Sequence, residues 1–207
     1  MEYDDKPFQT QASFHLAGII PIAGQPLDFE SPLPDCMMPI NKDYTLIEHA
    51  VYECALAGCD TIWLVCNDDI APVVRYRIGD YVQDPVYINR KVRFPSEHRR
   101  RIPIFYVPIH PKDRDKRDCL SWSVLHGAIT SLKVSSQLSK WVTPDKYYVS
   151  FPYGVFPAEE VREHRKLISS KKNFYVLNNS EHVGHGHYTS FTFGKDEFVK
   201  YRRNIRQ

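Results

Sequence analysis

Apolar runs alternate with an amphipathic stretch along the first third of the chain. Leu16–Ile22 lie in an apolar run that ends in Ala-Gly, and Thr61–Cys66 form a second run rich in β-branched residues. Between them, a capping box precedes apolar positions at helical spacing over Leu46–Ala57, and Gly58 follows as a stop. These elements predict a βαβ unit in which the two strands are parallel neighbours.

The same alternation continues to the end of the chain. Helix patterns cover Ile70–Tyr81, Leu120–Leu132, Ala158–Ser169 and the C-terminus, and strand patterns cover Ile102–Val107, Lys146–Phe151, Asn173–Leu177 and His187–Phe193. The proline-rich stretch Gln25–Asn41 predicts a long irregular loop. No internal repeat or linker is visible, so we expect residues 1–207 to form a single domain. Its fold class is predicted to be α/β, a three-layer α/β/α arrangement with a mixed, mainly parallel sheet.

Composition narrows the class of protein. The 207 residues are 43% hydrophobic and 13% aromatic, which suffices for a buried core and excludes an intrinsically disordered chain. The net charge of +2 does not require a nucleic-acid or membrane partner. Five cysteines without CxxC spacing predict reduced, buried thiols. Because no apolar run approaches the roughly 18 residues of a membrane span and the acidic start is unlike a signal peptide, we expect a cytoplasmic protein.

Several sequence segments occur in an order found in one enzyme family. The segments are AGIIPIAG, CMMPI, LIEHAVYECALAGCDTIWLVCNDD, SWSVLHGAI, YYVSFPYGVF and GHYTSFTFGKDEFVKY. In this order the chain resembles sugar-1-phosphate nucleotidyltransferases. The resemblance implies a nucleotide-diphospho-sugar transferase-like fold and, as ligand, a nucleotide, a nucleotide sugar or a sugar phosphate.

The resemblance also points to ligand-binding positions. We predict that the nucleotide contacts lie at the end of the first strand and at a helix start, at Ala23, Gly24, Gln25, Ser121 and Ser123. N-terminal capping explains the two serines equally well. The predicted substrate-binding residues are Tyr153, Gly154 and Gly186.

The family's reaction is attack of a sugar phosphate on the α-phosphate of a nucleoside triphosphate, which releases pyrophosphate. It requires an arginine, a lysine and carboxylates that hold Mg²⁺. Here Gly24–Leu27 contain no arginine, Asp35 stands where the lysine is expected, and Phe151–Gly154 contain no acid. We therefore assign no catalytic residue and expect nucleotidyl transfer to be impaired. Mg²⁺ would be a cofactor only if substitute carboxylates exist, for which the candidates are Asp28, Glu30, Asp115 and Asp118.

Two other polar clusters have residue types that can bind a metal ion or a nucleic acid. His182, His185 and His187 could supply imidazoles to Zn²⁺, but without a fourth ligand we predict that they bind no metal. The basic run Arg99–Arg101 could bind nucleic acid, although a solvated connecting loop explains it better.

The leading hypothesis is therefore a divergent nucleotidyltransferase-like domain that binds a nucleotide, nucleotide sugar or sugar phosphate. The alternative is a non-catalytic assembly or regulatory protein with the same fold, which would have a protein partner. A nucleic-acid-binding module is a weaker third hypothesis, and no membrane partner is expected.

Overall fold

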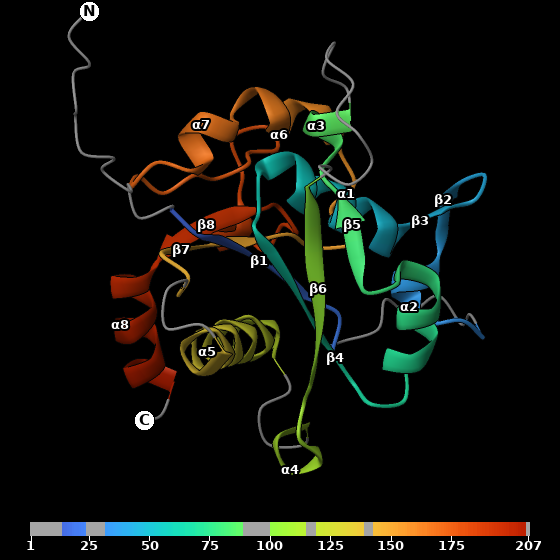
Figure 1. Ribbon diagram of the computed structural model, residues 1–207, viewed down its shortest axis with the longest axis horizontal. Coiled ribbons are helices and arrows are strands. Elements are labelled where there is room, and N and C mark those ends of the chain that lie inside the picture. Colours follow the sequence, from blue (N-terminus) through green and yellow to red (C-terminus); the bar gives the residue numbers. More distant parts are fainter. Residues whose placement is uncertain (1–13, 24–31, 89–99, 115–118, 139–142, 206–207) are drawn as a thin grey trace, which may run out of the picture.

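The architecture is a twisted sheet of six strands between two layers of helices (Figure 1). The computed structural model describes residues 14–23, 32–88, 100–114, 119–138 and 143–205. The sheet order is β5-β6-β4-β1-β7-β8. The strands are β1 (Leu16–Pro21), β4 (Thr61–Cys66), β5 (Tyr81–Gln83), β6 (Arg101–Pro108), β7 (Lys146–Val149) and β8 (Phe191–Gly194).

Four central strands are parallel, and one antiparallel strand closes each edge. β1 pairs in parallel with both β4 and β7, and β4 with β6, whereas β5 and β8 run antiparallel to their neighbours. The predicted mixed, mainly parallel sheet and the parallel pairing of the first two strands are confirmed. A small separate hairpin is formed by β2 (Pro39–Asn41) and β3 (Tyr44–Thr45).

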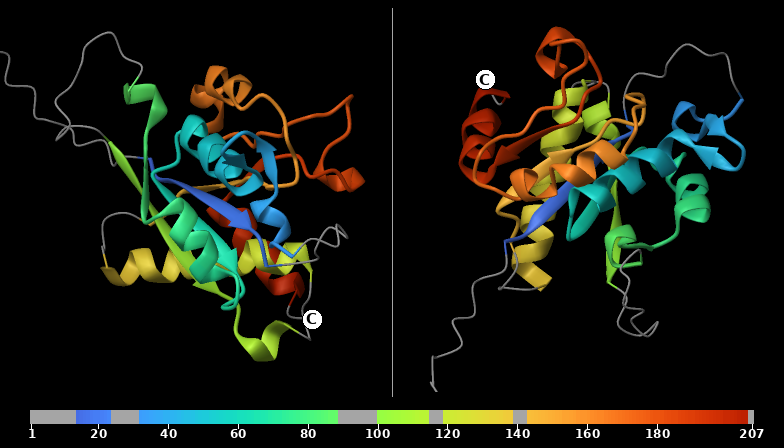
Figure 2. Two further views of the ribbon diagram at one scale, coloured as in Figure 1. Left: turned by 90° about the vertical axis from the view of Figure 1, so that its right-hand side faces the viewer. Right: turned by 90° about the horizontal axis from the view of Figure 1, so that it is seen from above.

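Helices cover both faces of the sheet (Figures 1 and 2). The helices are α1 (Leu46–Ala57), α2 (Ala71–Ile78), α3 (Pro85–Ile88), α4 (Pro111–Arg114), α5 (Leu120–Leu138), α6 (Glu159–Glu163), α7 (Arg165–Ile168) and α8 (Lys195–Ile205). One buried core joins α1, α2, α6 and α7 to one sheet face, and a second joins α5 and α8 to the other. This is the predicted three-layer α/β/α arrangement.

Local sequence explains the exact length of α1. Thr45 donates to Glu48 from both its backbone N–H and its hydroxyl, each at 2.8 Å, and so forms the predicted capping box. Gly58 ends the helix with a φ of 94°, a left-handed conformation that glycine adopts without steric cost. The predicted helix Leu46–Ala57 is confirmed residue for residue.

Four predicted elements were wrong in detail. Of the predicted strand His187–Phe193, only Phe191–Phe193 belong to a strand, β8. Asn173–Leu177 form no strand, because only Tyr175 makes a bridge, to Phe191, and the segment instead lies along β8 through single hydrogen bonds. The predicted helix Ala158–Ser169 is broken at His164 into α6 and α7. Gly79, with a φ of 80°, ends α2, so that Tyr81 belongs to an edge strand and not to the helix.

The cysteines follow the predicted pattern with one exception. All five are free thiols, and Cys36, Cys54, Cys59 and Cys66 are buried. Burial raises the pKa of the Cys36 and Cys66 thiols to about 12. Cys119 is exposed, contrary to expectation, because it lies directly before α5.

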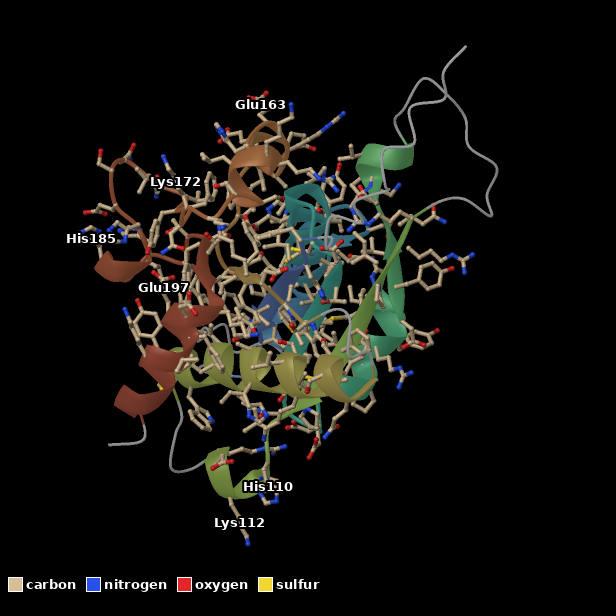
Figure 3. All side chains as sticks on the ribbon, turned by 60° about the vertical axis from the view of Figure 1, so that its left-hand side comes forward. His110, Lys112, Glu163, Lys172, His185 and Glu197 are labelled. Atoms are coloured by element: carbon tan, nitrogen blue, oxygen red, sulfur yellow. The ribbon has the colours of Figure 1, made fainter. Side chains whose placement is uncertain are left out.

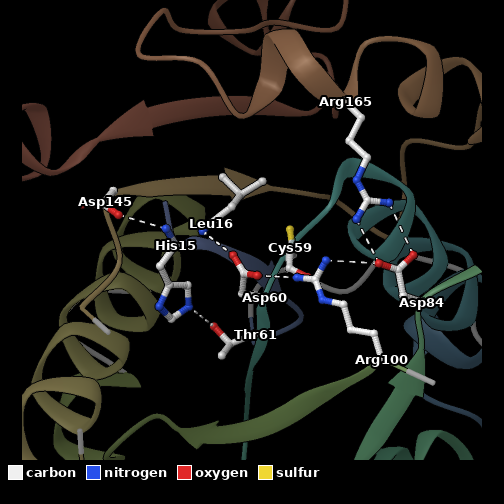
Figure 4. A network of polar contacts seen from close by, with 9 residues as sticks. All are labelled: His15, Leu16, Cys59, Asp60, Thr61, Asp84, Arg100, Asp145 and Arg165. Carbon is white, nitrogen blue, oxygen red and sulfur yellow. Dashed lines mark hydrogen bonds and ion pairs between the residues drawn. The ribbon is translucent and has the colours of Figure 1, made fainter. Parts of the chain in front are cut away.

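A charged network holds together the amino ends of the strands (Figure 4). Asp84 is fully buried and accepts hydrogen bonds from Arg165 at 2.9 Å and from Arg100 at 3.2 Å. Arg100 also pairs with Asp60, whose other oxygen accepts the backbone N–H of Leu16 at 2.9 Å. The network therefore connects β1, β4, β5 and α7 at the end of the sheet where the parallel strands begin.

Part of the basic run Arg99–Arg101 takes part in this network. Arg100 is committed to Asp60 and Asp84, and the guanidinium of Arg101 lies 4.7 Å from the centroid of the Tyr81 ring. Arg99 lies outside the described residues. Two of the three arginines thus have structural partners within the protein.

Candidate functional site

The topology singles out one place for a ligand. From β1 the chain moves through β4 to β6 on one side, and later returns to β7 on the other side of β1. In open α/β sheets, ligands bind at the carboxyl ends of the strands where the order switches in this way. Here that position lies between the ends of β1 and β7, beside the first turn of α5.

The structure brings two predicted nucleotide-binding segments together at this position. Ala23 follows β1, and its N–H donates to the Val65 carbonyl at 2.9 Å. Its own carbonyl accepts the hydroxyl of Ser123, on the first turn of α5, at 2.7 Å, and both residues are buried. The Ser123 hydroxyl therefore holds Ala23, just after β1, against α5. Gly24 and Gln25 lie outside the described residues.

Tyr153 and Gly154, predicted to bind substrate, follow β7. Gly154 lies so close to the chain before β8 that a Cβ atom there would be 1.8 Å from the Tyr188 carbonyl oxygen. The rings of Tyr153 and Tyr188 meet edge to face, with centroids 5.6 Å apart. Phe151 is buried, so the position after β7 where the family holds its metal with an acid is apolar and aromatic here.

We expect Gly154→Ala to destabilise the fold by about 3 kcal/mol, because the new methyl group would collide with backbone that cannot rotate away. Urea unfolding followed by circular dichroism measures this. Gly194→Ala is the matched control, since a Cβ at Gly194 would meet no atom within 4 Å. Equal stability of the two variants would contradict this packing role for Gly154.

Asp35 lies close to the segment after β7. It begins a short 3-10 helix (Asp35–Met37), and its Oδ2 is buried with no hydrogen-bond partner among the described residues. The pKa of Tyr153 is raised, first by burial and then by the nearby Cys36 and Asp35. The acidic side chain at the position where the resemblance places a lysine therefore lies near Tyr153.

A buried carboxylate that we did not predict from the sequence holds this region to α1 by hydrogen bonds. Glu53, on α1, is fully buried and accepts hydroxyl hydrogen bonds from Tyr148 at 2.6 Å, from Ser150 at 2.9 Å and from Ser190. Desolvation raises its pKa to about 7. Ser150 and Ser190 directly precede Phe151 and Phe191, so Glu53 ties α1 to both chain segments at the end of β7 and the start of β8.

A pocket of about 440 Å³ opens beside this region, between α5, β8 and α8. Ser121 lines it, whereas Ser123, Tyr153, Gly154 and Gly186 do not. The other lining residues are mainly aromatic and aliphatic and are Leu120, Val124, Leu125, Phe151, Tyr175, His182, Val183, Gly184, Phe191, Phe193, Glu197 and Tyr201. They come from five separate segments, so no local sequence pattern could have identified the pocket.

The histidine segment is held together by its own hydrogen bonds. His182 Nδ1 accepts the Gly184 N–H at 3.0 Å, and His185 Nδ1 accepts the His182 N–H at 3.2 Å. His187 pairs with Glu181. Gly186 is exposed with a φ of 90°, and Figure 3 shows His185 at the outer edge of the molecule. Within the described residues, no group of three or more His, Cys, Asp or Glu side chains is arranged to hold a metal ion.

Other acids near the carboxyl ends of the strands have partners. Asp68, after β4, pairs with Arg114 at 3.4 Å, and Asp69 accepts the Ile70 N–H at 3.1 Å. The four substitute carboxylates proposed from the sequence, Asp28, Glu30, Asp115 and Asp118, all lie outside the described residues.

Comparison with known proteins defines the fold class. No protein-family model and no curated protein matches the sequence. Among solved structures, Rv0371c from Mycobacterium tuberculosis H37Rv aligns with a TM-score of 0.55 at 13% identity, over 92% of this chain and 76% of that one. A putative glucose-1-phosphate thymidylyltransferase from Bacillus anthracis, in complex with a sucrose, aligns with a TM-score of 0.56 at 12% identity, over 89% and 73% of the two chains.

These likenesses establish a fold. The described part of the chain is an α/β protein with a mixed six-stranded sheet and the nucleotide-diphospho-sugar transferase fold. In the described part of the chain, no helix is long and apolar enough to cross a lipid bilayer.

Proposed function

We propose that this chain is a single nucleotidyltransferase-like domain that binds a nucleotide, nucleotide sugar or sugar phosphate at the carboxyl ends of β1 and β7. We further propose that it acts in the cytoplasm and carries out little or no nucleotidyl transfer. One observation carries the proposal. The hydrogen bond from Ser123 holds Ala23, just after β1, against α5, while an apolar, aromatic segment follows β7, where the resemblance places a metal-binding acid.

Electrostatics favour binding without turnover. Transfer at an α-phosphate builds negative charge that cations and Mg²⁺ must offset. Asp35 adds negative charge, and Phe151–Gly154 contribute no carboxylate to a metal site. Helix α5 still directs its positive amino end toward the ends of the strands, which favours an anionic ligand.

Incubation with nucleoside triphosphates, sugar 1-phosphates and Mg²⁺ should release pyrophosphate no faster than buffer does. Each missing group typically contributes about 100- to 1000-fold to the rate, and three are missing. A coupled pyrophosphate assay measures this, with an active sugar-1-phosphate nucleotidyltransferase as positive control. Rapid turnover that is lost on changing Asp28, Glu30, Asp115 or Asp118 would show that the chain has a rebuilt metal site.

Ligand binding is tested separately by calorimetric titration with nucleoside triphosphates, nucleotide sugars and sugar 1-phosphates. Asp35→Asn should tighten binding of the phosphorylated ligands, because it removes a negative charge beside the proposed phosphate position. Exposed Asp80 gives a matched control, Asp80→Asn. Absence of binding by every ligand to the natural protein and to Asp35→Asn would refute the proposed function.

A protein partner is the second candidate, and one surface favours it. On α2, Val73 and Tyr76 lie one turn apart with 45% and 95% of their surface exposed. Exposed apolar side chains in neighbouring positions are typical of protein interfaces. If this surface binds a partner, Tyr76→Asp should abolish the complex and leave ligand binding unchanged.

A further inference from the structure

We propose that the pocket between α5, β8 and α8 binds an uncharged planar aromatic or heteroaromatic ring. This pocket adjoins the proposed phosphate position, with which it shares Phe151 and the first turn of α5. It shares Ser121 with the predicted nucleotide contacts, and Ala23 and Ser123 do not line it. The inference therefore does not require that the chain bind phosphate or sugar.

The shape of the pocket suits a flat ligand. The rings of Tyr175 and Phe191 are nearly parallel, at 10°, with centroids 6.3 Å apart. Phe151 and Phe193 are each tilted by about 30° from Phe191, at 6.1 Å. Together these side chains form a wall of similarly oriented rings against which another ring can stack. The volume of about 440 Å³ is within the usual range for small-molecule sites.

The rim of the pocket adds exposed aromatic surface. Tyr175 and Tyr201 line the pocket and still expose 46% and 51% of their surface. Tyr201 lies on α8, whereas the lining residues Leu120 and Ser121 lie on α5. Apolar rings that are left exposed beside a cavity mark a place where a ligand would remove them from water.

The charges of the lining residues argue against a polyphosphate as the ligand. No lysine or arginine is found among the described lining residues, so a di- or triphosphate would lack a counter-charge there. The lining carboxylate, Glu197, accepts hydrogen bonds from Asn173 at 2.7 Å and from the Gly194 N–H at 3.0 Å. Figure 3 shows Glu197 at the start of α8, where its carboxylate accepts the N–H of the residue before the helix, Gly194.

A few polar groups remain for the edge of a ring. Because His182 Nδ1 accepts the Gly184 N–H, the neutral imidazole carries its proton on Nε2 and can donate from there. The Ser121 hydroxyl can both donate and accept. This combination of an aromatic wall and few polar groups suits a heteroaromatic ring better than a hexose, whose many hydroxyls would stay unpaired.

The test uses uncharged ring compounds with the whole chain: adenosine, guanosine, cytidine, uridine and, as a ring without a sugar, indole. Calorimetric titration should detect binding of at least one. Tyr175→Ala and Tyr201→Ala should each weaken that binding about tenfold, the usual contribution of an aromatic stacking partner. Tyr76→Ala removes an exposed tyrosine far from the pocket lining and should leave binding unchanged.

The outcomes distinguish the possible ligands of the pocket. Binding of nucleosides alone identifies a nucleoside ring as ligand, and binding of indole alone identifies another aromatic compound. The proposal fails if no ring compound binds at millimolar concentration, or if all three tyrosine variants bind as the natural protein does. It also fails if Tyr175→Ala and Tyr201→Ala only change the oligomeric state, since the rings then serve a protein interface. Titration with glucose 1-phosphate, which has no aromatic ring, tests the proposed function independently.

Discussion

Replacing Asp84 by alanine should lower the free energy of unfolding by about 3–5 kcal/mol, the usual cost of removing one partner from a buried ion pair. Asp84 is fully buried and accepts hydrogen bonds from Arg100 and Arg165, and from the Val86 N–H at 3.0 Å. Without this carboxylate, the largely buried guanidinium of Arg165 would lose its acidic partner, and Arg100 would keep Asp60 alone. The lost ion pairs and the lost hydrogen bonds both act against folding.

Urea unfolding at pH 7 measures the change. Asp80→Ala is the matched control, because Asp80 also pairs with an arginine, Arg75 at 2.8 Å, but both side chains are more than 60% exposed. An exposed pair contributes about 0–1 kcal/mol. If Asp84→Ala were as mild as Asp80→Ala, the network at the amino ends of the strands would not be what joins α7 to the sheet.

The regular part of the fold could be predicted because local and tertiary preferences agree there. The capping box at Thr45, the apolar spacing over Leu46–Ala57 and the stop at Gly58 all indicate one helix, and the buried strands on each side need its apolar face. Errors arose where tertiary contacts decide. The segment Asn173–Leu177 has a strand pattern, but it meets β8 at only one bridge because its hydrogen bonds go partly to the Thr192 side chain.

The candidate site was predictable only where it follows strand ends. Ala23 and Tyr153 come directly after apolar runs. Because parallel strands end at the same end of a sheet, the two segments could be expected to lie close together. The pocket and the Glu53 cluster could not be predicted in this way. Tyr148, Ser150 and Ser190 lie about 95 to 137 positions from Glu53 in the sequence, and each is by itself an ordinary residue for a strand or loop.

The buried carboxyl group of Glu53 should make the free energy of unfolding fall as pH rises. The carboxyl group has an ordinary pKa of 4.5, which burial raises to about 7 in the folded protein. The folded state therefore holds the proton more tightly than the unfolded state. The stabilisation from this proton is complete below pH 4.5 and is lost as pH rises to about 7, and it amounts to about 3 kcal/mol.

Glu53→Gln should remove this dependence, because glutamine has nearly the same shape and stays neutral. Its carbonyl oxygen can accept from the hydroxyls of Tyr148 and Ser190, and its amide can donate to the Ser150 oxygen. We expect the variant to match the natural protein near pH 5 and to be up to about 3 kcal/mol more stable at pH 8.

The measurement is the difference in unfolding free energy between Glu53→Gln and the natural protein across pH 5 to 8, in which the contributions of all other titrating groups cancel. Glu163→Gln, at an exposed position on α6, should give a difference that does not change with pH. A constant difference for Glu53→Gln as well would mean that Glu53 stays ionised at pH 5. In that case the three hydroxyl donors would stabilise the buried charge more than desolvation opposes it, and Glu53 would hold the end of β7 to α1 as a permanent anion.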